Sequence, residues 1–249
     1  MKVKARVIVN ADDFGYSESI NYAILKAFDM NIISTTTLIC NMPGFTAACE
    51  VAHSRDLIEK IGIHFNLSEG QPLTEPIKGH KNFYKDGQMY KSFKGHFINK
   101  NESFAVLLEL QSQIDRCRTM GINPTHCDTH HHLHHSWGIG KLVKHIALKN
   151  GIPSVRLRFN WGAMSYKRRL FSGLYNLRLK VASLAKTNYF CEIRSVTPKL
   201  LMKNAVVEVM VHPVLDSSGN LTNYKDGSNL FKLIEKHLLV DRFLNFKDL

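Results

Sequence analysis

The chain has 249 residues, of which 44% are hydrophobic, and its 33 lysines and arginines against 21 aspartates and glutamates give a formal net charge of +12. This length and apolar content suit a single globular domain over residues 1–249, and no apolar run approaches the ~18–20 residues that cross a membrane. The five cysteines are odd in number and lack C-x-x-C spacing, which argues against a disulfide framework and a thiolate zinc site and favours a reducing compartment, the cytoplasm.

Strands and helices are predicted to alternate along the chain. The first predicted strand covers residues 4–11 and leads into a helix over 17–29, which has one apolar face and Ser17 as its N-cap. Further strands are predicted at 34–40, 61–67, 124–131, 153–159 and 205–213, and further helices at 103–118, 137–149 and 166–186. Such alternation predicts a parallel sheet, either open or closed into a barrel.

The stretch 68–102 has no clear periodicity and is rich in lysine, glycine and aromatic residues. A long insertion of this kind in a compact domain is often a lid or a binding loop, although a variable surface loop has the same composition. Tyr84, Tyr90 and Phe93 favour the lid-like loop, because aromatic rings stack on sugar rings.

Nearly all of the excess positive charge lies between residues 129 and 191, where eleven lysines and arginines occur without a single aspartate or glutamate. Such a segment attracts polyanions, anionic lipid or a phosphorylated small substrate, unless it serves only solubility beside neighbouring acidic surface. No recognisable nucleic-acid-binding module accompanies the charge. We therefore expect no nucleic acid as a partner, and, because no apolar run is long enough to span a bilayer, no membrane.

Polar residues follow the predicted strands at the ends where active sites gather in parallel α/β folds. They are Asp12 and Asp13, then His64, then the cluster 126–130, then His212. Taken singly, the acidic pair is typical of a turn or helix cap. Each single histidine is typical of a core residue whose hydrogen bonds are satisfied. Taken together, one carboxylate and two imidazoles predict an open metal site, with the second carboxylate available as a base.

Residues 125–135 hold six of the chain's 13 histidines. If this stretch is extended, alternation places His130 and His132 on one face together with His126 and Asp128, and His131 on the other. The spacing does not choose between His130 and His132 as a metal ligand. By the same alternation Asp12 and Asp13 point to opposite sides.

Four motifs, VNADDFGYSESIN, GIHFNLSEGQPL, PTHCDTHHHLH and EVMVHP, resemble in order and spacing those of the YdjC/ChbG family of carbohydrate deacetylases, over roughly residues 6–213. The resemblance implies a distorted TIM-like (β/α) barrel, a homodimer, and removal of acetate from N-acetylated sugars such as chitooligosaccharides or their phosphates. It implies Asp13, His64 and His130 as ligands of one divalent metal and Asp12 as the general base. His212 takes the position of a further active-site histidine, and Asp128 or His126 that of a residue supporting His130.

The sequence thus predicts a metal-dependent hydrolase with Asp12 and His212 in catalysis. Asp-His-His ligation suits Zn²⁺, Mn²⁺, iron or Co²⁺, and with several waters it also suits Mg²⁺. Arg156 is expected either to bind an anionic part of the substrate or to orient Asp12. The alternatives are a metal-dependent phosphoesterase or nuclease, which needs a second metal, and a non-enzymatic binding protein, which would not need both aspartates.

Overall fold

The computed structural model describes residues 4–90, 98–238, 240 and 243–249, so Phe93 of the expected lid lies outside the described residues. The strands are β1 (Arg6–Phe14), β2 (Thr35–Leu38), β3 (Ile61–Phe65), β4 (Tyr84–Lys85), β5 (Gln88–Met89), β6 (Cys127–Thr129), β7 (Tyr189–Glu192), β8 (Val206–Val211), β9 (Pro213–Leu215) and β10 (Leu221–Asn223). The helices are α1 (Glu18–Asp29), α2 (Phe45–Ser54), α3 (Lys100–Thr119), α4 (Trp137–Lys149), α5 (Tyr166–Val181), α6 (Pro198–Leu201) and α7 (Leu230–His237).

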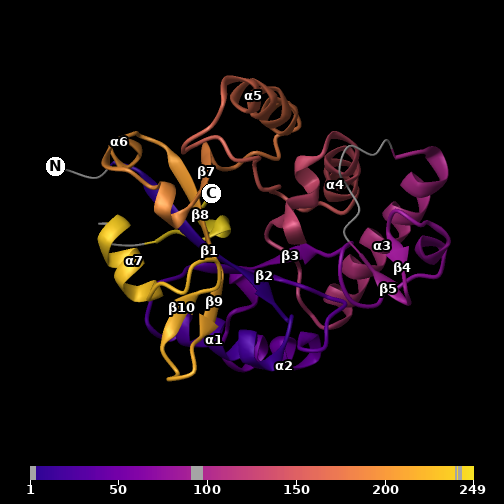
Figure 1. The fold of residues 1–249 in the computed structure, drawn as a ribbon, viewed down its shortest axis with the longest axis horizontal. Coiled ribbons are helices and arrows are strands. Elements are labelled where there is room, and N and C mark those ends of the chain that lie inside the picture. The colour runs from indigo at the N-terminus through magenta and orange to yellow at the C-terminus, as the bar shows by residue number, and fades with distance from the viewer. Residues whose placement is uncertain (1–3, 91–97, 239, 241–242) are drawn as a thin grey trace.

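A six-stranded sheet in the order β6-β3-β2-β1-β8-β7 forms the centre of the molecule, and helices surround it (Figure 1). All its neighbouring strands pair in parallel, as the alternation of elements predicted. β1 and β8 are buried almost throughout, which matches the apolar runs 7–9 and 209–211 within them. Among the described helices, none is both long and apolar enough to cross a membrane.

The prediction of a strand over 153–159 is wrong, because only Val155 forms a bridge, to Cys127 of β6. The segment nevertheless runs between the two edges of the sheet. The Cys127 amide donates to the Ser154 carbonyl at 2.9 Å, and the Asn160 amide donates to the Phe190 carbonyl of β7 at 3.4 Å. This irregular segment brings the curled sheet close to closure, as a distorted (β/α) barrel requires.

The predicted helices are confirmed with small changes at their ends. Ser17 caps α1 by accepting a hydrogen bond from the Ile20 amide. α5 ends at Val181 and not at residue 186, because Ser183 adopts a left-handed backbone conformation (φ 57°) and the Leu184 amide bonds back to the Leu179 carbonyl.

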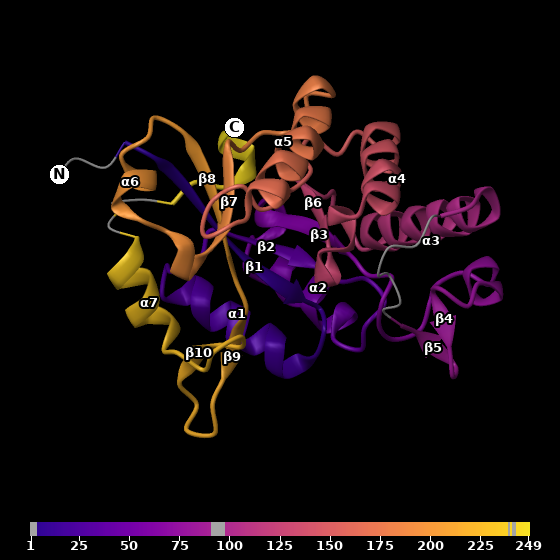
Figure 2. The ribbon, with the colours of Figure 1, turned by 45° about the horizontal axis from the view of Figure 1, so that its top comes forward.

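Several elements were not predicted. They are the helices α2, α6 and α7, the edge strand β7, and two small hairpins, β4–β5 and β9–β10. The β4–β5 hairpin belongs to the insertion 68–102 and lies at the far end of α3 (Figure 2). The β9–β10 hairpin packs against α1 and directly follows β8, and it therefore stands beside the strand ends that carry the polar residues.

Candidate active site

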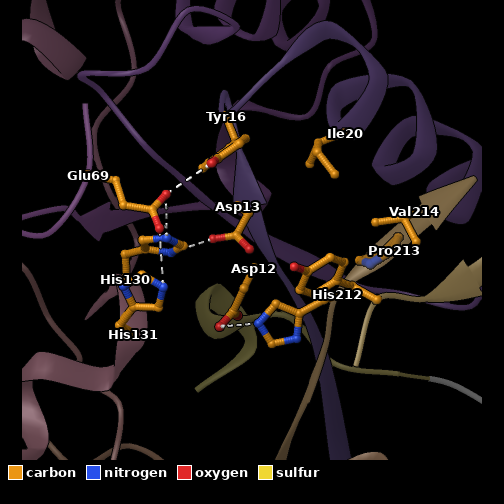
Figure 3. A pocket seen from close by; sticks show the side chains of 11 residues that line it. Asp12, Asp13, Tyr16, Ile20, Glu69, His130, His131, His212, Pro213 and Val214 are labelled. Carbon is orange, nitrogen blue, oxygen red and sulfur yellow. Dashed lines mark hydrogen bonds and ion pairs between the residues drawn. The ribbon is translucent and has the colours of Figure 1, made fainter. Parts of the chain in front are cut away.

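A pocket opens where the polar residues follow the strands, and it holds a cavity of about 170 Å³ (Figure 3). Its lining residues are Asp12, Asp13, Tyr16, Ile20, Glu69, His130, His131, His212, Pro213, Val214 and Tyr224. Of the described residues in the insertion 68–102, Glu69 alone is in this lining. The lid-like role of Tyr84 and Tyr90 stays a prediction.

Asp12 and Asp13 both line the pocket because β1 carries a bulge at this point. Ala11 pairs with Thr36 and Phe14 with Leu38, so the two aspartates stand opposite one residue of β2. Asp13 has a left-handed backbone (φ 76°), a strained conformation that is frequent at functional sites. The expectation that strand alternation separates the two carboxylates is therefore wrong.

Asp13, His64 and His130 bring three potential ligand atoms within 4.8 Å of one another. Asp13 Oδ1 lies 3.2 Å from His64 Nε2 and 2.9 Å from His130 Nδ1. Burial opposes ionisation of Asp13, but the two imidazoles hold the pKa of its carboxyl well below its usual range. Asp13 Oδ1 is nevertheless buried and has no hydrogen bond of good geometry among the described residues. An ionised oxygen facing two imidazole nitrogens fits a divalent cation.

His64 is oriented from behind by a buried carboxylate. Its Nδ1 lies 2.5 Å from Asp128 Oδ1 and 3.1 Å from Thr37 Oγ1, which directs Nε2 toward Asp13. Although burial lowers it, the pKa of His64 is raised to about 10 by Asp128 and Asp13. A carboxylate behind the imidazole is the usual support of a metal-binding histidine. Asp128 thus supports His64 and not His130, contrary to the expectation.

His130 is supported by Glu69, a residue that the sequence reasoning did not single out. Glu69 Oε2 lies 3.5 Å from His130 Nε2 and accepts a hydrogen bond from the Tyr16 hydroxyl at 3.0 Å. The bond with His130 lowers the pKa of Glu69 from its ordinary value. The available signal was an acidic residue just beyond the strand that carries His64. His126, the other expected support, lies elsewhere and stacks on Phe246.

The histidine run does not continue as a strand after Thr129. Residues 130–135 form a 3-10 turn in which His131 and His132 have left-handed backbones, with φ of 53° and 54°. His131 therefore reaches the pocket, with Nε2 3.4 Å from Glu69 Oε1, and the expectation that it faces away is wrong. His132 instead stacks on His135, beside Phe159. Only one of the two candidate ligands, His130, is beside Asp13.

This geometry predicts different results for two matched substitutions. His130→Ala is expected to abolish stoichiometric metal binding, because it removes one of three ligand atoms. His132→Ala is expected to keep about one metal per chain and to lower stability only, because it leaves a cavity beside Phe159. Metal content after dialysis, measured by mass spectrometry on both proteins, checks this. Loss of metal from His132→Ala alone would reverse the choice of ligand.

Arg156 is buried among three carboxylates. Its two terminal nitrogens donate to the two oxygens of Asp12, each at 2.7 Å, and Nε donates to Glu208 Oε1 at 2.5 Å. Asp128 also pairs with it. Because the guanidinium has no exposed surface, the expectation that Arg156 binds substrate is wrong, and the alternative that it orients Asp12 fits its position. Burial opposes ionisation of Asp12, yet Arg156 keeps the pKa of that carboxyl well below its usual range.

His212 directly follows β8 and lies beside Asp12. Its Nε2 lies 3.9 Å from Asp12 Oδ2. The β9–β10 hairpin fixes its backbone: the His212 amide donates to Asn223 Oδ1 at 3.1 Å, and the Tyr224 amide donates to the His212 carbonyl at 2.8 Å. Burial lowers the pKa of His212 although Asp12 and Asp13 raise it, so the imidazole is neutral at neutral pH.

Comparison with known proteins identifies the family of this chain. The family model described as YdjC-like protein matches residues 6–237. A protein of Halalkalibacterium halodurans named carbohydrate deacetylase is 30% identical over 84% of both chains. One of Clostridium beijerinckii with the same name is 35% identical, over 59% of this chain and 58% of that protein. A crystal structure from Enterococcus faecalis V583, described as a candidate cellobiose-phosphate cleavage protein, covers 98% of both chains with a TM-score of 0.72 and 19% identity, which shows the shared fold. The predicted fold class and family resemblance are thereby confirmed, and the chain belongs to the YdjC-like protein family.

Proposed function

We propose that this protein is a metal-dependent carbohydrate deacetylase that removes acetate from N-acetylated sugars. The observation that carries the proposal is the convergence of Asp13, His64 and His130. Of these, Asp13 and His130 line the same pocket as Asp12 and His212. This arrangement combines a site for one divalent cation with two groups that exchange protons. The names of the relatives, carbohydrate deacetylase, point to the same chemistry.

Asp13, His64 and His130 would hold the metal, with Mg²⁺ or Zn²⁺ as the first candidates and Mn²⁺ or Co²⁺ next. A bound divalent metal would supply Lewis-acid polarisation of the acetyl carbonyl and a lowered pKa for the attacking water. Asp128 keeps His64 turned toward Asp13, and Glu69 does the same for His130, so both imidazoles would be oriented for the metal.

Asp12 and His212 carry the proton steps. Asp12 accepts the proton of the attacking water, and its bidentate contact with Arg156 keeps the carboxylate ionised and fixed in orientation. His212 delivers a proton to the departing amine of the sugar. Because His212 is neutral before the reaction and lies 3.9 Å from Asp12, a proton accepted by Asp12 has a short path to the imidazole.

The pocket walls match a sugar that carries an acetamido group. Tyr16 and Tyr224 offer aromatic rings and hydroxyls, and Ile20, Pro213 and Val214 offer apolar surface. We infer chitooligosaccharides or N-acetylglucosamine-type sugars, with or without a phosphate, as the substrate class. The cytoplasmic location and the homodimer expected from the sequence stay predictions.

The phosphoesterase alternative requires a second metal about 3.5–4 Å from the first, usually bridged by carboxylates. Glu69, His130 and His131 form a second group of clustered ligand atoms, but this group shares His130 with the first. A third group, Asp12, His64 and Asp128, shares His64 with the first, and both of its carboxylates pair with Arg156. The single-metal deacetylase therefore explains the site with fewer assumptions.

The test is acetate release from a panel of N-acetylated mono- and disaccharides, each with and without a 6-phosphate. We expect release from at least one sugar, loss of release after chelation, and recovery when a divalent metal is restored. Bis-p-nitrophenyl phosphate serves as the comparison substrate under the same conditions. Metal-dependent cleavage of this diester, with no acetate from any sugar, would favour the phosphoesterase.

A further inference from the structure

Helix α5 (Tyr166–Val181) presents an apolar side to solvent. Its packed side consists of Ser172, Tyr175, Asn176 and Leu179, two of which are polar. The side opposite carries five large apolar residues, here called the α5 stripe, which are 52–80% exposed: Tyr166, Leu170, Leu174, Leu177 and Val181. An ordinary surface helix buries its apolar face and exposes its polar face, so this orientation is reversed.

Cations border the α5 stripe along both edges. At 3.6 residues per turn, Lys167 and Arg178 lie along one edge and Arg169 and Lys180 along the other. Within the described part of the chain, no carboxylate forms an ion pair with any of these four residues, although carboxylates pair with other surface lysines and arginines. The stripe thus combines apolar surface with uncompensated positive charge over a helix about 24 Å long.

A tryptophan extends this surface onto the neighbouring helix. Trp137 begins α4 and is 49% exposed, with its ring 6.0 Å from that of Phe171 and the Arg178 guanidinium 3.9 Å above it. Both views show α5 at the edge of the molecule with α4 as its neighbour, on the opposite side of the sheet from α1 and α2 (Figures 1 and 2). Tryptophan beside arginine and apolar residues is the composition found at membrane–water interfaces.

The charge decides between two kinds of partner. A second copy of this chain that packed its own α5 stripe against this one would bring cations against cations, because residues 129–191 contain no acid that could pair with them. An anionic lipid surface supplies phosphates for the cations and acyl chains for the stripe. The length of the helix and its solvent-facing orientation suit a helix that lies in the plane of the interface.

We propose that the α5 stripe docks this protein onto the surface of an anionic phospholipid membrane. The apolar residues enter the boundary between headgroups and acyl chains, and the exposed Lys167, Arg169 and Lys180 contact lipid phosphates, while Arg178 stacks on Trp137. This docking requires no membrane-spanning helix. It revises the expectation that no membrane is a partner, which rested on the absence of a span, and it is independent of the proposed enzymatic function.

Vesicle co-sedimentation of the full chain tests the proposal. We expect binding to vesicles of phosphatidylcholine mixed with phosphatidylglycerol, little binding to phosphatidylcholine alone, and weakening at high salt. Leu174→Glu is expected to lower the partition coefficient about tenfold or more. Phe104→Glu on α3 replaces an apolar residue that is also exposed, at 63%, and is expected to leave binding unchanged.

Thermal melting and acetate release show whether the Leu174→Glu protein is folded, and Leu170→Glu takes its place if it is not. Equal binding of the wild type to both kinds of vesicle, or of Leu174→Glu and the wild type to the anionic ones, would overturn the proposal. So would sedimentation velocity without lipid if it shows a wild-type dimer that Leu174→Glu dissociates, because the stripe would then be a subunit interface.

Discussion

Asp12→Asn is expected to lower acetate release about 10²–10⁴-fold while the metal stays bound. The amide has the size of the carboxylate but cannot accept a proton from water. The substituted side chain would keep one oxygen for Arg156, whose charge remains paired with Asp128 and Glu208, so the fold should persist. Steady-state acetate release and metal content per chain, measured on the same preparation, check both halves of this expectation.

Asp13→Asn is the matched control, since the two aspartates are neighbours of the same chemistry with different expected roles. It should lose the metal together with the activity, because Asp13 supplies an anionic ligand atom. Turnover of Asp12→Asn within about tenfold of the wild type, with metal bound, would show that Asp12 is not the base. His212 would then become the candidate, because its neutral imidazole can also accept a proton.

Arg156→Met is expected to lower the free energy of unfolding by about 3–5 kcal/mol at neutral pH. The substitution leaves Asp12, Asp128 and Glu208 buried without their shared guanidinium, and a buried charge without a partner is costly. Burial already raises the pKa of Glu208 to about 7 in the presence of Arg156. Urea unfolding followed by circular dichroism on the wild type and the variant measures the difference.

Arg158→Met is the matched control, two residues away on the same segment. Arg158 donates to the hydroxyl of Ser172 and the carbonyl of His135, so its removal leaves no buried carboxylate without a partner. We expect the free energy of unfolding to fall by about 1 kcal/mol, which is the range of an ordinary hydrogen bond. If both variants lost the same free energy of unfolding, burial of the three carboxylates would not require Arg156 as their partner.

The loss in free energy of unfolding caused by Arg156→Met should depend on pH, because Arg156 lowers the pKa of Asp12. A carboxyl whose pKa is lower in the folded state than in the unfolded state stabilises the fold above its unfolded pKa, and this contribution fades as the pH falls toward the folded value. The variant lacks the contribution from Arg156. The difference in free energy of unfolding between the wild type and Arg156→Met should therefore be largest at neutral pH and become small below about pH 4.

The sequence located the site because its signals are local. An apolar run marks a buried strand, a polar residue after it marks the strand's end, and parallel strands bring such ends together whatever their order. Asp12, Asp13, His64 and His212 could be named in this way, together with the histidine run that contains His130. The choice of His130 over His132 came from the family resemblance. Parallel strands were enough to bring these residues to one edge of the sheet, as the alternation of helices and strands had predicted.

What the sequence did not reveal depends on contacts between distant segments. The bulge at Asp12 and Asp13 is a property of the register between β1 and β2, and the place of Arg156 depends on carboxylates from three strands, β1, β6 and β8. The turn after Thr129 is stabilised in part by a bond between the His134 amide and the Thr129 hydroxyl, which no periodicity indicates. Residue patterns predict the end of a strand better than the conformation of the chain beyond it.

The bulge in β1 has a consequence for how robust the chemistry is. Asp12 and Asp13 are consecutive residues, so their α-carbons are separated by one peptide unit, about 3.8 Å, whatever happens elsewhere in the fold. Covalent bonds therefore set the spacing between the backbones of the proposed base and the proposed metal ligand, and the bulge turns both carboxylates toward the pocket. His212 comes from another strand, and its distance from Asp12 depends on how β8 and its hairpin pack. Heating, or a mutation that shifts β8 relative to β1, should change the distance between His212 and Asp12 before it changes the distance between Asp12 and Asp13.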